Sequence, residues 1–194
     1  MSASSTLQRK LSHMFSGMVF PMSALFLPRV VLLSLLGAAT FIFSGFELLR
    51  LKVPIINRWF WLYFKPLLRE KEGSRLTGAS YMLISSLIAF LAFPRDVAVL
   101  ALAFLAIGDA IGTIIGVRIG KRKLLGKTLE GDLACFISCV AIGLILNYGA
   151  LNIPLLTMLI GSVGATLIEA LPLPINDNLT MPLFAGLVMT LTQL

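Results

Sequence analysis

The chain has 194 residues, of which 58% are hydrophobic and only 13% are charged, whereas a soluble domain carries about 25% charged residues. This composition excludes a soluble globular protein, a disordered chain, a coiled coil and a disulfide scaffold. The net charge of +7 would favour nucleic acid as the partner of a soluble protein. Here the basic residues stand between apolar segments, so we expect the lipid bilayer as the partner and no nucleic-acid polymer.

Seven apolar segments approach the roughly 20 residues that a helix needs to cross a bilayer. In chain order they are residues 14–27, 30–49, 77–94, 97–117, 133–149, 153–171 and 181–194. None alternates between apolar and polar residues, which excludes a transmembrane barrel. The first segment is short and contains Pro21, so we leave open whether it crosses completely. The predicted fold class is an all-α integral membrane protein, a bundle of about seven transmembrane helices that forms one domain over residues 1–194.

A different composition marks residues 54–70, where aromatic side chains are mixed with Arg and Lys. Trp59, Trp61 and Tyr63 suit the level of the lipid headgroups. We expect an interfacial amphipathic helix that lies on the cytoplasmic surface. A linker with aromatic anchors is the alternative.

The basic residues predict the orientation. Of the 16 Lys and Arg, all but Arg29 and Arg95 lie in the N-terminus, in residues 50–75 or in residues 118–131. With seven spans these regions share one side, which the positive-inside rule places in the cytoplasm. The N-terminus is then cytoplasmic and the C-terminus is outside. We find no signal-peptide cleavage site and expect a multi-pass protein of a prokaryotic inner membrane.

Asp109 is a carboxylate inside a predicted span, where a charge costs roughly 2.5–3.5 kcal/mol on insertion scales and is functional by default. Gly112, Gly116 and Gly120 follow on the same helix face. The glycines alone predict a seam where two helices pack closely. Because a carboxylate stands on that seam, we also expect a groove where a metal ion and a polyanion approach the backbone.

The next connection, RIGKRKLLGKTLEGD at 118–132, is rich in Lys, Arg and Gly. It is not a Walker A loop, because five residues rather than four separate Gly120 from the GKT triplet. We expect Lys127 to contact phosphate and Glu130 to hold Mg²⁺ through oxygen. The alternatives are a solvated basic loop and, for Glu130 and Asp132, capping of the following helix.

More acids lie at the cytoplasmic ends of the predicted spans. Glu169 is a second carboxylate inside a span, and Asp177 and Asn178 follow it after two prolines. Asp177 or Asn178 could instead cap the last helix. Together with Asp109 and Glu130, these acids stand beside a basic connection, which is what a Mg²⁺–nucleotide site requires.

Two smaller features lie on the same side. Arg9, Lys10 and His13 form an RKxxH motif before the first segment, although a lone interfacial histidine is often inert. Glu47 and Arg50 are spaced to pair with each other on one helix face.

The order of these motifs resembles the CTP-dependent lipid-alcohol kinase family, which includes dolichol kinase, phytol and farnesol kinases and the fungal CTP-using diacylglycerol kinase. The motifs are RKxxH at 9–13, GD at 108–109, GKTLEG at 126–131, the intramembrane Glu169 and DN at 177–178. The chain is short, as in the prokaryotic members. The resemblance implies CTP as the phosphoryl donor. The acceptor would be a lipid alcohol such as phytol, farnesol, geranylgeraniol, a polyprenol or diacylglycerol.

The expected function is a kinase that transfers the γ-phosphoryl group of CTP to a lipid hydroxyl at the cytoplasmic face. Mg²⁺ is the expected cofactor, and its expected ligands are Asp109, Glu130 and Asp177. The expected catalytic residues are Asp109, Glu169 and Lys127. The expected nucleotide-binding residues are Arg9, Lys10, Gly112, Gly116, Lys121, Gly126, Lys127 and Gly131.

Two other functions stay open. A CDP-lipid synthase also uses CTP, but it joins the nucleotide to a lipid phosphate and releases pyrophosphate. A small membrane transporter would use intramembrane acids as an ion path, although these acids gather at one membrane face. A homo-oligomer is open as well, because the glycine faces could pack within one chain or between chains.

Overall fold

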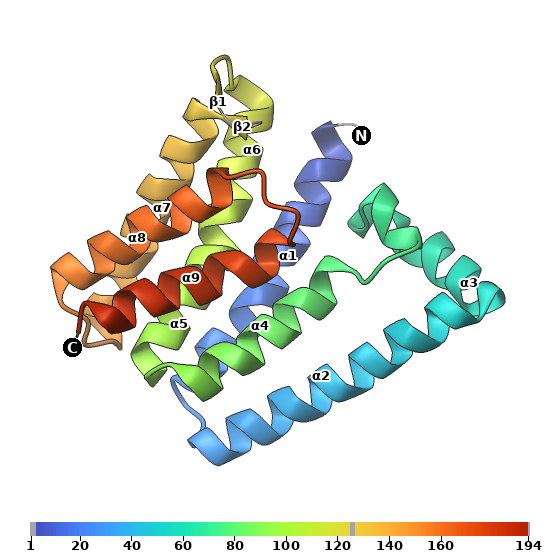
Figure 1. The fold of residues 1–194 in the computed structure, drawn as a ribbon, viewed down its shortest axis with the longest axis horizontal. Coiled ribbons are helices and arrows are strands. Elements are labelled where there is room, and N and C mark those ends of the chain that lie inside the picture. The colour runs from blue at the N-terminus through green and yellow to red at the C-terminus, as the bar shows by residue number, and fades with distance from the viewer. Residues whose placement is uncertain (1–2, 125–126, 194) are drawn as a thin grey trace.

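The computed structural model describes residues 3–124 and 127–193, with side chains from residue 6 onward. Most of these residues are helical, which confirms the predicted all-α class (Figure 1). The α-helices are α1 (Ala3–Ala24), α2 (Arg29–Lys52), α3 (Pro54–Phe64), α4 (Gly78–Ala92), α5 (Arg95–Ala103), α6 (Ala110–Ile119), α7 (Leu129–Gly149), α8 (Leu155–Ala170) and α9 (Asp177–Leu191). The shorter elements are the 3-10 turns η1 (Lys65–Leu67) and η2 (Glu70–Gly73), the π-helical segment η3 (Phe104–Asp109) and the strands β1 (Lys123–Leu124) and β2 (Lys127–Thr128).

Three helical stretches among the described residues are long and apolar enough to cross a membrane. They are α2, the continuous run Arg95–Ile119 and α7. Helices α4 and α8 are apolar but shorter. These helices support a membrane protein, while the number of about seven spans stays a prediction.

The helix expected over residues 54–70 is shorter than predicted. Helix α3 ends at Phe64, and the turns η1 and η2 follow. Pro66 has no N–H group and so cannot continue the hydrogen-bond ladder of the helix. Helix α3 has no buried residue, which is compatible with a surface position.

Helices α7 and α9 begin earlier than predicted, because the chain supplies capping side chains upstream. Thr128 caps α7 by accepting a hydrogen bond from the backbone N–H three residues later. Asn176 caps α9 in the same way, by accepting a hydrogen bond from the backbone N–H of Asn178. Glu130, Asp132 and Asp177 lie in the first turns instead. The alternative that Asp177 or Asn178 is the N-cap of α9 is therefore wrong. Glu130 and Asp132 lie in the first turn of α7, where a negative charge suits the helix dipole.

Helix α5 and the π-helical segment η3 form the centre of the molecule. Every residue from Val97 to Ala106 is buried, and α1, α4, α7 and α9 pack around them (Figure 1). The small and aliphatic side chains of this stretch allow helices to pack on all sides of it. A π-helical turn is often found at a functional site, and this one ends at Asp109.

The predicted glycine seam joins α6 to α7. A Cβ atom on Gly112 would lie 3.0 Å from the carbonyl oxygen of Gly131 and 2.9 Å from Cβ of Cys135. A Cβ atom on Gly131 would lie 2.9 Å from the carbonyl oxygen of Gly112. The close packing of the two helices therefore depends on glycine at both positions, and the seam interpretation is confirmed.

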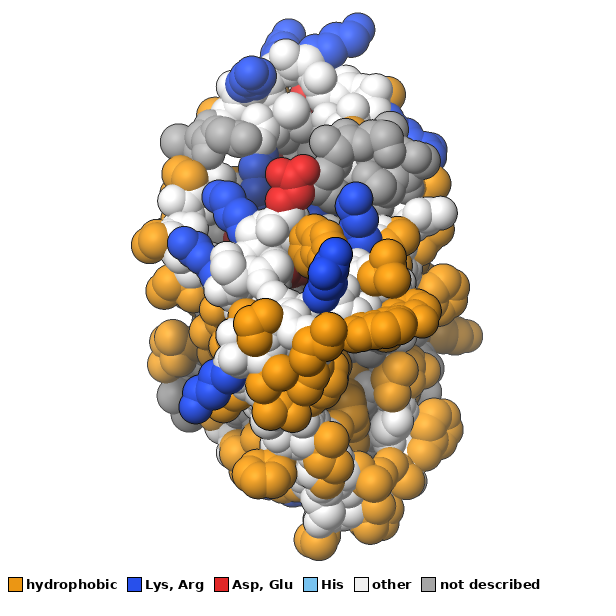
Figure 2. Space-filling view, turned by 90° about the vertical axis from the view of Figure 1, so that its right-hand side faces the viewer, with side chains coloured by type: hydrophobic (Ala, Val, Ile, Leu, Met, Phe, Trp, Pro, Cys, Tyr) orange, Lys and Arg blue, Asp and Glu red, His pale blue; other side chains and the backbone are white. Residues whose placement is uncertain are grey.

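Charged and apolar side chains are separated on the surface. Figure 2 shows Lys and Arg gathered mainly over the upper part of one face, with hydrophobic side chains over its lower part. Large exposed apolar areas mark a surface that contacts something other than water. This separation fits helices embedded in lipid, with their basic ends at the headgroups.

Candidate active site

The RKxxH and GD motifs meet at a buried ion pair between α1 and the end of η3. Lys10 Nζ lies 2.6 Å from Asp109 Oδ2, and both residues are almost fully buried. Thr113 Oγ1 donates a 3.3 Å hydrogen bond to the other carboxylate oxygen. His13, one turn after Lys10, has its Nε2 atom 3.7 Å from Asp109 Oδ2. A buried ion pair is poor evidence of added stability, because desolvation offsets the attraction.

A second cluster joins three elements that are far apart in the sequence. Lys127 on β2 donates a hydrogen bond to Glu169 Oε1 near the end of α8, and its Nζ atom lies 3.7 Å from Asp177 Oδ2 on α9. Burial disfavours the charged amine, but the attraction of Glu169 and Asp177 outweighs it and raises the pKa of Lys127. Lys127 is therefore a stable cation that could bind phosphate.

A pocket of about 280 Å³ lies beside this second cluster, and we call it the glycine pocket. Its lining residues are Gly112, Thr113, Gly116, Val117, Lys123, Lys127, Thr128, Gly131, Asp132 and Glu169. Its three glycines stand where α6 and α7 pack closely, and Gly112 and Gly131 are buried. The two lysines give the pocket the positive charge that a phosphate site requires.

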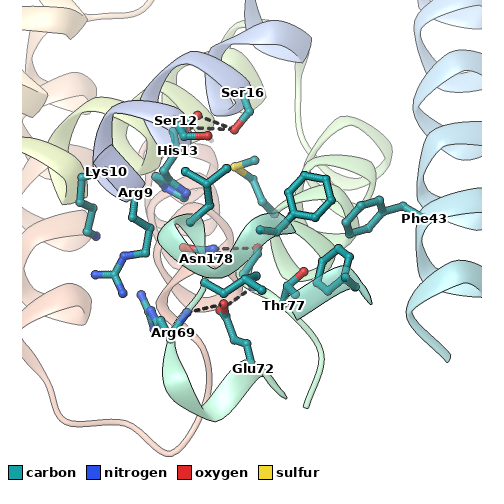
Figure 3. Close-up of a pocket in the computed structure, with 17 residues that line it drawn as sticks. Arg9, Lys10, Ser12, His13, Ser16, Phe43, Arg69, Glu72, Thr77 and Asn178 are labelled. Atoms are coloured by element: carbon teal, nitrogen blue, oxygen red, sulfur yellow. Dashed lines mark hydrogen bonds between the residues drawn. The ribbon is translucent and has the colours of Figure 1, made fainter. Parts of the chain in front are cut away.

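A second pocket of about 290 Å³ combines charged and apolar side chains, and we call it the amphipathic pocket (Figure 3). Its charged or titratable lining residues are Arg9, Lys10, His13, Arg69 and Glu72. Its apolar lining residues are Phe43, Phe60, Phe64, Leu67, Leu68, Ala79 and Met82. The others are Ser12, Ser16, Thr77, Gly78 and Asn178. Figure 3 shows Arg9, Lys10 and Arg69 at one end and Phe43 at the other.

The two pockets are joined by side-chain contacts. Lys10 lines the amphipathic pocket and pairs with Asp109, which in turn accepts a hydrogen bond from Thr113 of the glycine pocket. Asp177 faces Lys127 of the glycine pocket, whereas its neighbour Asn178 lines the amphipathic pocket. We call the four residues Lys10, Asp109, Asp177 and Asn178 the junction. Two ligands, one in each pocket, would meet there.

A buried network around Arg50 fixes one side of the amphipathic pocket. Arg50 Nε lies 2.7 Å from Glu47 Oε1, and the guanidinium donates to the carbonyl oxygens of Glu72 and Arg75 at 3.1 and 2.9 Å. The other Glu47 oxygen accepts a 2.7 Å hydrogen bond from the Thr77 N–H. The spacing of Glu47 and Arg50 was visible in the sequence. Their complete burial and their hold on the connection before α4 were not, because both depend on residues more than 20 positions away.

Several predicted site residues lie elsewhere. Glu130 is exposed, and its carboxylate accepts hydrogen bonds from the backbone N–H groups of Lys121 and Arg122. It holds the turn that leads from α6 to the β1–β2 hairpin. Arg9 lines the amphipathic pocket and not the glycine pocket. Gly126 lies outside the described residues.

The predicted magnesium ligands do not form one cluster. Within residues 3–124 and 127–193, no group of three or more His, Cys, Asp or Glu side chains could hold a metal ion. Mg²⁺ in nucleotide sites is usually held by one or two carboxylates together with substrate phosphates. Both oxygens of Asp109 are engaged by Lys10 and Thr113, whereas Asp177 faces Lys127. Magnesium binding by these two carboxylates stays a prediction.

Distant homologues of the chain include lipid kinases, which supports a kinase at the level of the family. The chain is 28% identical over 209 residues to probable phytol kinase 1, chloroplastic, of Glycine max, with 91% of this chain and 64% of that protein covered. It is 25% identical over 166 residues to CTP-dependent diacylglycerol kinase 1 of Schizosaccharomyces pombe, with 77% and 75% covered.

A more similar relative shows the family. The chain is 30% identical over 182 residues to uncharacterized protein RP860 of Rickettsia prowazekii, with 91% of this chain and 89% of that protein covered. The chain belongs to the same family as that protein. No family model and no solved structure matches the chain.

Proposed function

We propose that this protein is a CTP-dependent kinase that phosphorylates a lipid alcohol at the cytoplasmic face of a prokaryotic inner membrane. The observation that carries the proposal is the pair of lysine–carboxylate contacts, Lys10 with Asp109 and Lys127 with Asp177, of which Lys127 lines the glycine pocket. The names of the two distant kinases support the same class of activity.

The nucleotide would bind in the glycine pocket. Lys123 and Lys127 line this pocket and would offset the negative charge of a phosphate chain. CTP is proposed because one distant relative is named as CTP-dependent and because the sequence motifs resemble a CTP-using family. Asp109 and Asp177 would hold Mg²⁺, which would neutralise charge on the transferring phosphoryl group.

Phosphoryl transfer depends on positioning and charge neutralisation more than on covalent chemistry by the protein. The lipid oxygen would form a bond to the γ-phosphorus, the bond from that phosphorus to the β-γ bridging oxygen would break, and CDP would leave. A carboxylate would take the proton of the alcohol. Glu169 is suited to this role, because a phosphate that attracts Lys127 would release its hydrogen-bond partner.

The substrate would enter sideways from the bilayer. An alcohol that stays in the membrane does not expose its chain to water, which would cost about 0.8 kcal/mol for each CH₂ group. The basic ends of the helices would lie in the cytoplasm with the junction near the headgroups, according to the positive-inside rule. This orientation requires the seven predicted crossings. It is the same whether the protein is a monomer or a homo-oligomer.

The proposal is tested with γ-labelled CTP, Mg²⁺ and liposomes that contain one alcohol from a panel of phytol, farnesol, geranylgeraniol, a polyprenol and diacylglycerol. The variant Asp109→Asn is compared with Asp96→Asn, whose carboxylate lines neither pocket and accepts a hydrogen bond from the Asn152 N–H. We expect label on a lipid with the native protein and with Asp96→Asn, but not with Asp109→Asn.

The same samples distinguish the other functions. No labelled lipid from any alcohol, in a preparation that keeps its helical circular dichroism, would overturn the kinase proposal for these substrates. Labelled pyrophosphate, released when phosphatidate is added, would indicate a CDP-lipid synthase instead.

A further inference from the structure

We propose that the amphipathic pocket is the acceptor site, in which the hydroxyl end of a long-chain alcohol binds beside Thr77 and Asn178 while its chain lies against Phe43 and Phe60. The nature of the reaction rests on the proposed kinase function. The pocket itself is argued from the contacts and the burial of its lining residues.

The polar end of the pocket contains unsatisfied hydrogen-bonding atoms. Thr77 Oγ1, Asn178 Oδ1 and His13 Nε2 are buried and have no hydrogen-bond partner among the described residues. Thr77 is 2% exposed and Asn178 is 3% exposed. Because buried polar atoms are nearly always paired with protein or water, three such atoms at one pocket indicate a polar ligand group. A hydroxyl fits, since it can donate to Asn178 Oδ1 and accept from Thr77 Oγ1.

The other hydrogen-bonding groups of Thr77 and Asn178 are held by the protein. The Thr77 N–H donates to Glu47, and Asn178 Nδ2 donates to the carbonyl oxygen of Gly78 at 2.7 Å. Glu72 binds the N–H groups of Gly78 and of Arg69 at 2.9 and 2.8 Å. The pocket wall is thus held in place before any ligand arrives, as a binding site requires.

The other end of the pocket is suited to hydrocarbon. Phe43, Phe60, Phe64 and Met82 line it, and none of these side chains can hydrogen-bond to a pyrimidine ring or pair with a phosphate. An apolar chain gains free energy by leaving water for such a surface. Phe64 and Leu67 are 46% and 38% exposed, so this end of the pocket reaches the protein surface and a chain could continue into the bilayer.

The polar end adjoins the proposed nucleotide site. Asn178 follows Asp177, which faces Lys127 of the glycine pocket, and Lys10 of the amphipathic pocket pairs with Asp109. A hydroxyl beside Asn178 would therefore lie at the junction. The chain would point away from it, toward the end that Figure 3 marks with Phe43.

A nucleotide is the competing occupant, because Arg9, Lys10 and Arg69 at the polar end could bind phosphate. The phenylalanine rings of the apolar end can stack on a cytosine base, but none of its apolar side chains can hydrogen-bond to the edge of that base. The experiment therefore measures whether changes in this pocket affect the alcohol or CTP.

Steady-state kinetics tests the two ends separately. Thr77→Val removes only the unpartnered hydroxyl, and we expect kcat/KM for the alcohol to fall about tenfold, with KM for CTP unchanged. Its control is Thr180→Val, which removes a second unpartnered buried hydroxyl that lines neither pocket. Phe43→Ala should raise KM for the alcohol, whereas Phe41→Ala, on the same helix and 83% exposed, should not.

Photo-crosslinking tests binding without turnover. The probe is a long-chain alcohol with a diazirine in its chain, added to the native protein without CTP. We expect crosslinks to peptides that contain Phe43, Phe64 or Met82, which a non-hydrolysable CTP analogue does not displace.

The outcomes separate this inference from the proposed function. Crosslinks at the expected peptides without any phosphorylated lipid would support the pocket and overturn the kinase. Turnover with crosslinks confined to α6 and α7, or with KM for CTP as the only constant changed by Thr77→Val, would keep the kinase and overturn the acceptor site. Displacement of the probe by the CTP analogue would overturn it as well.

Discussion

The glycine pocket and the amphipathic pocket differ in the side chains that line them. In the glycine pocket, Lys127 and Glu169 pair with each other, and Asp132 Oδ2 has no hydrogen-bond partner among the described residues. In the amphipathic pocket, Thr77 and Asn178 keep polar atoms without a partner, beside a phenylalanine-rich surface. The first pocket suits a highly charged ligand that exchanges ion pairs with the protein. The second suits a ligand with one polar end and a long apolar part.

The largest effect is expected at the buried pair of Lys10 and Asp109. Asp109→Asn leaves Lys10 as a buried cation without its counter-charge, so we expect the free energy of unfolding to fall by about 3–5 kcal/mol and transfer to be lost. The double variant Lys10→Met/Asp109→Leu replaces the pair by apolar side chains and should regain much of this stability. Unfolding in mixed detergent measures both variants.

Activity separates the two roles of this pair. The double variant should stay inactive in the labelled-CTP assay although it is folded. Recovery of activity together with stability would show that the pair serves only the fold.

The next largest effect should change catalysis at the glycine pocket without changing binding in the amphipathic pocket. Lys127→Met removes one of the two lysines of the glycine pocket, and the loss of one such charged donor typically lowers kcat about 100- to 1,000-fold. The crosslinking of the alcohol probe should not change. Lys71→Met, an exposed lysine that lines neither pocket, is the control. Equal kinetic losses in both lysine variants would contradict a specific phosphate contact.

A smaller effect tests the close packing of α6 and α7 beside the glycine pocket. A Cβ atom on Gly131 would press on the carbonyl oxygen of Gly112, so Gly131→Ala should cost about 1–3 kcal/mol of stability and raise KM for CTP. Gly37→Ala on α2 is the matched control, because nothing lies within 4 Å of its Cβ position. It should be neutral or stabilising by up to about 1 kcal/mol. A neutral Gly131→Ala would show that α6 and α7 can separate.

The smallest effect is expected at Glu130, which lines neither pocket. Its carboxylate binds the N–H groups of Lys121 and Arg122, so Glu130→Gln should change kcat little and leave the Mg²⁺ requirement unchanged. A Mg²⁺ titration of turnover is the measurement. A large rise in the Mg²⁺ concentration needed would instead support the metal-ligand role that the sequence predicts.

Much of the glycine pocket could be predicted because its parts are close together in the sequence. Gly112 and Gly116 lie on one face of a helix, and Lys127 and Gly131 belong to one short motif. The amphipathic pocket could not be predicted in this way. Its residues come from α1, α2, α3, α4 and α9. Asn178 belongs to the DN motif, but nothing in the sequence brings it together with Thr77, which looks like an ordinary residue at the start of a helix.

The sequence by itself determined the helical class, the apolar segments and the faces on which the glycines and the acids stand, because these follow from composition and from the helical period. Only the tertiary structure decided that Lys10 meets Asp109, 99 residues away, and that Lys127 meets Glu169. It also decided that Glu130 turns to the backbone instead of toward these clusters. The physical reason is that periodicity fixes the relative positions of residues within one helix, whereas contacts between helices depend on how all of them pack at once.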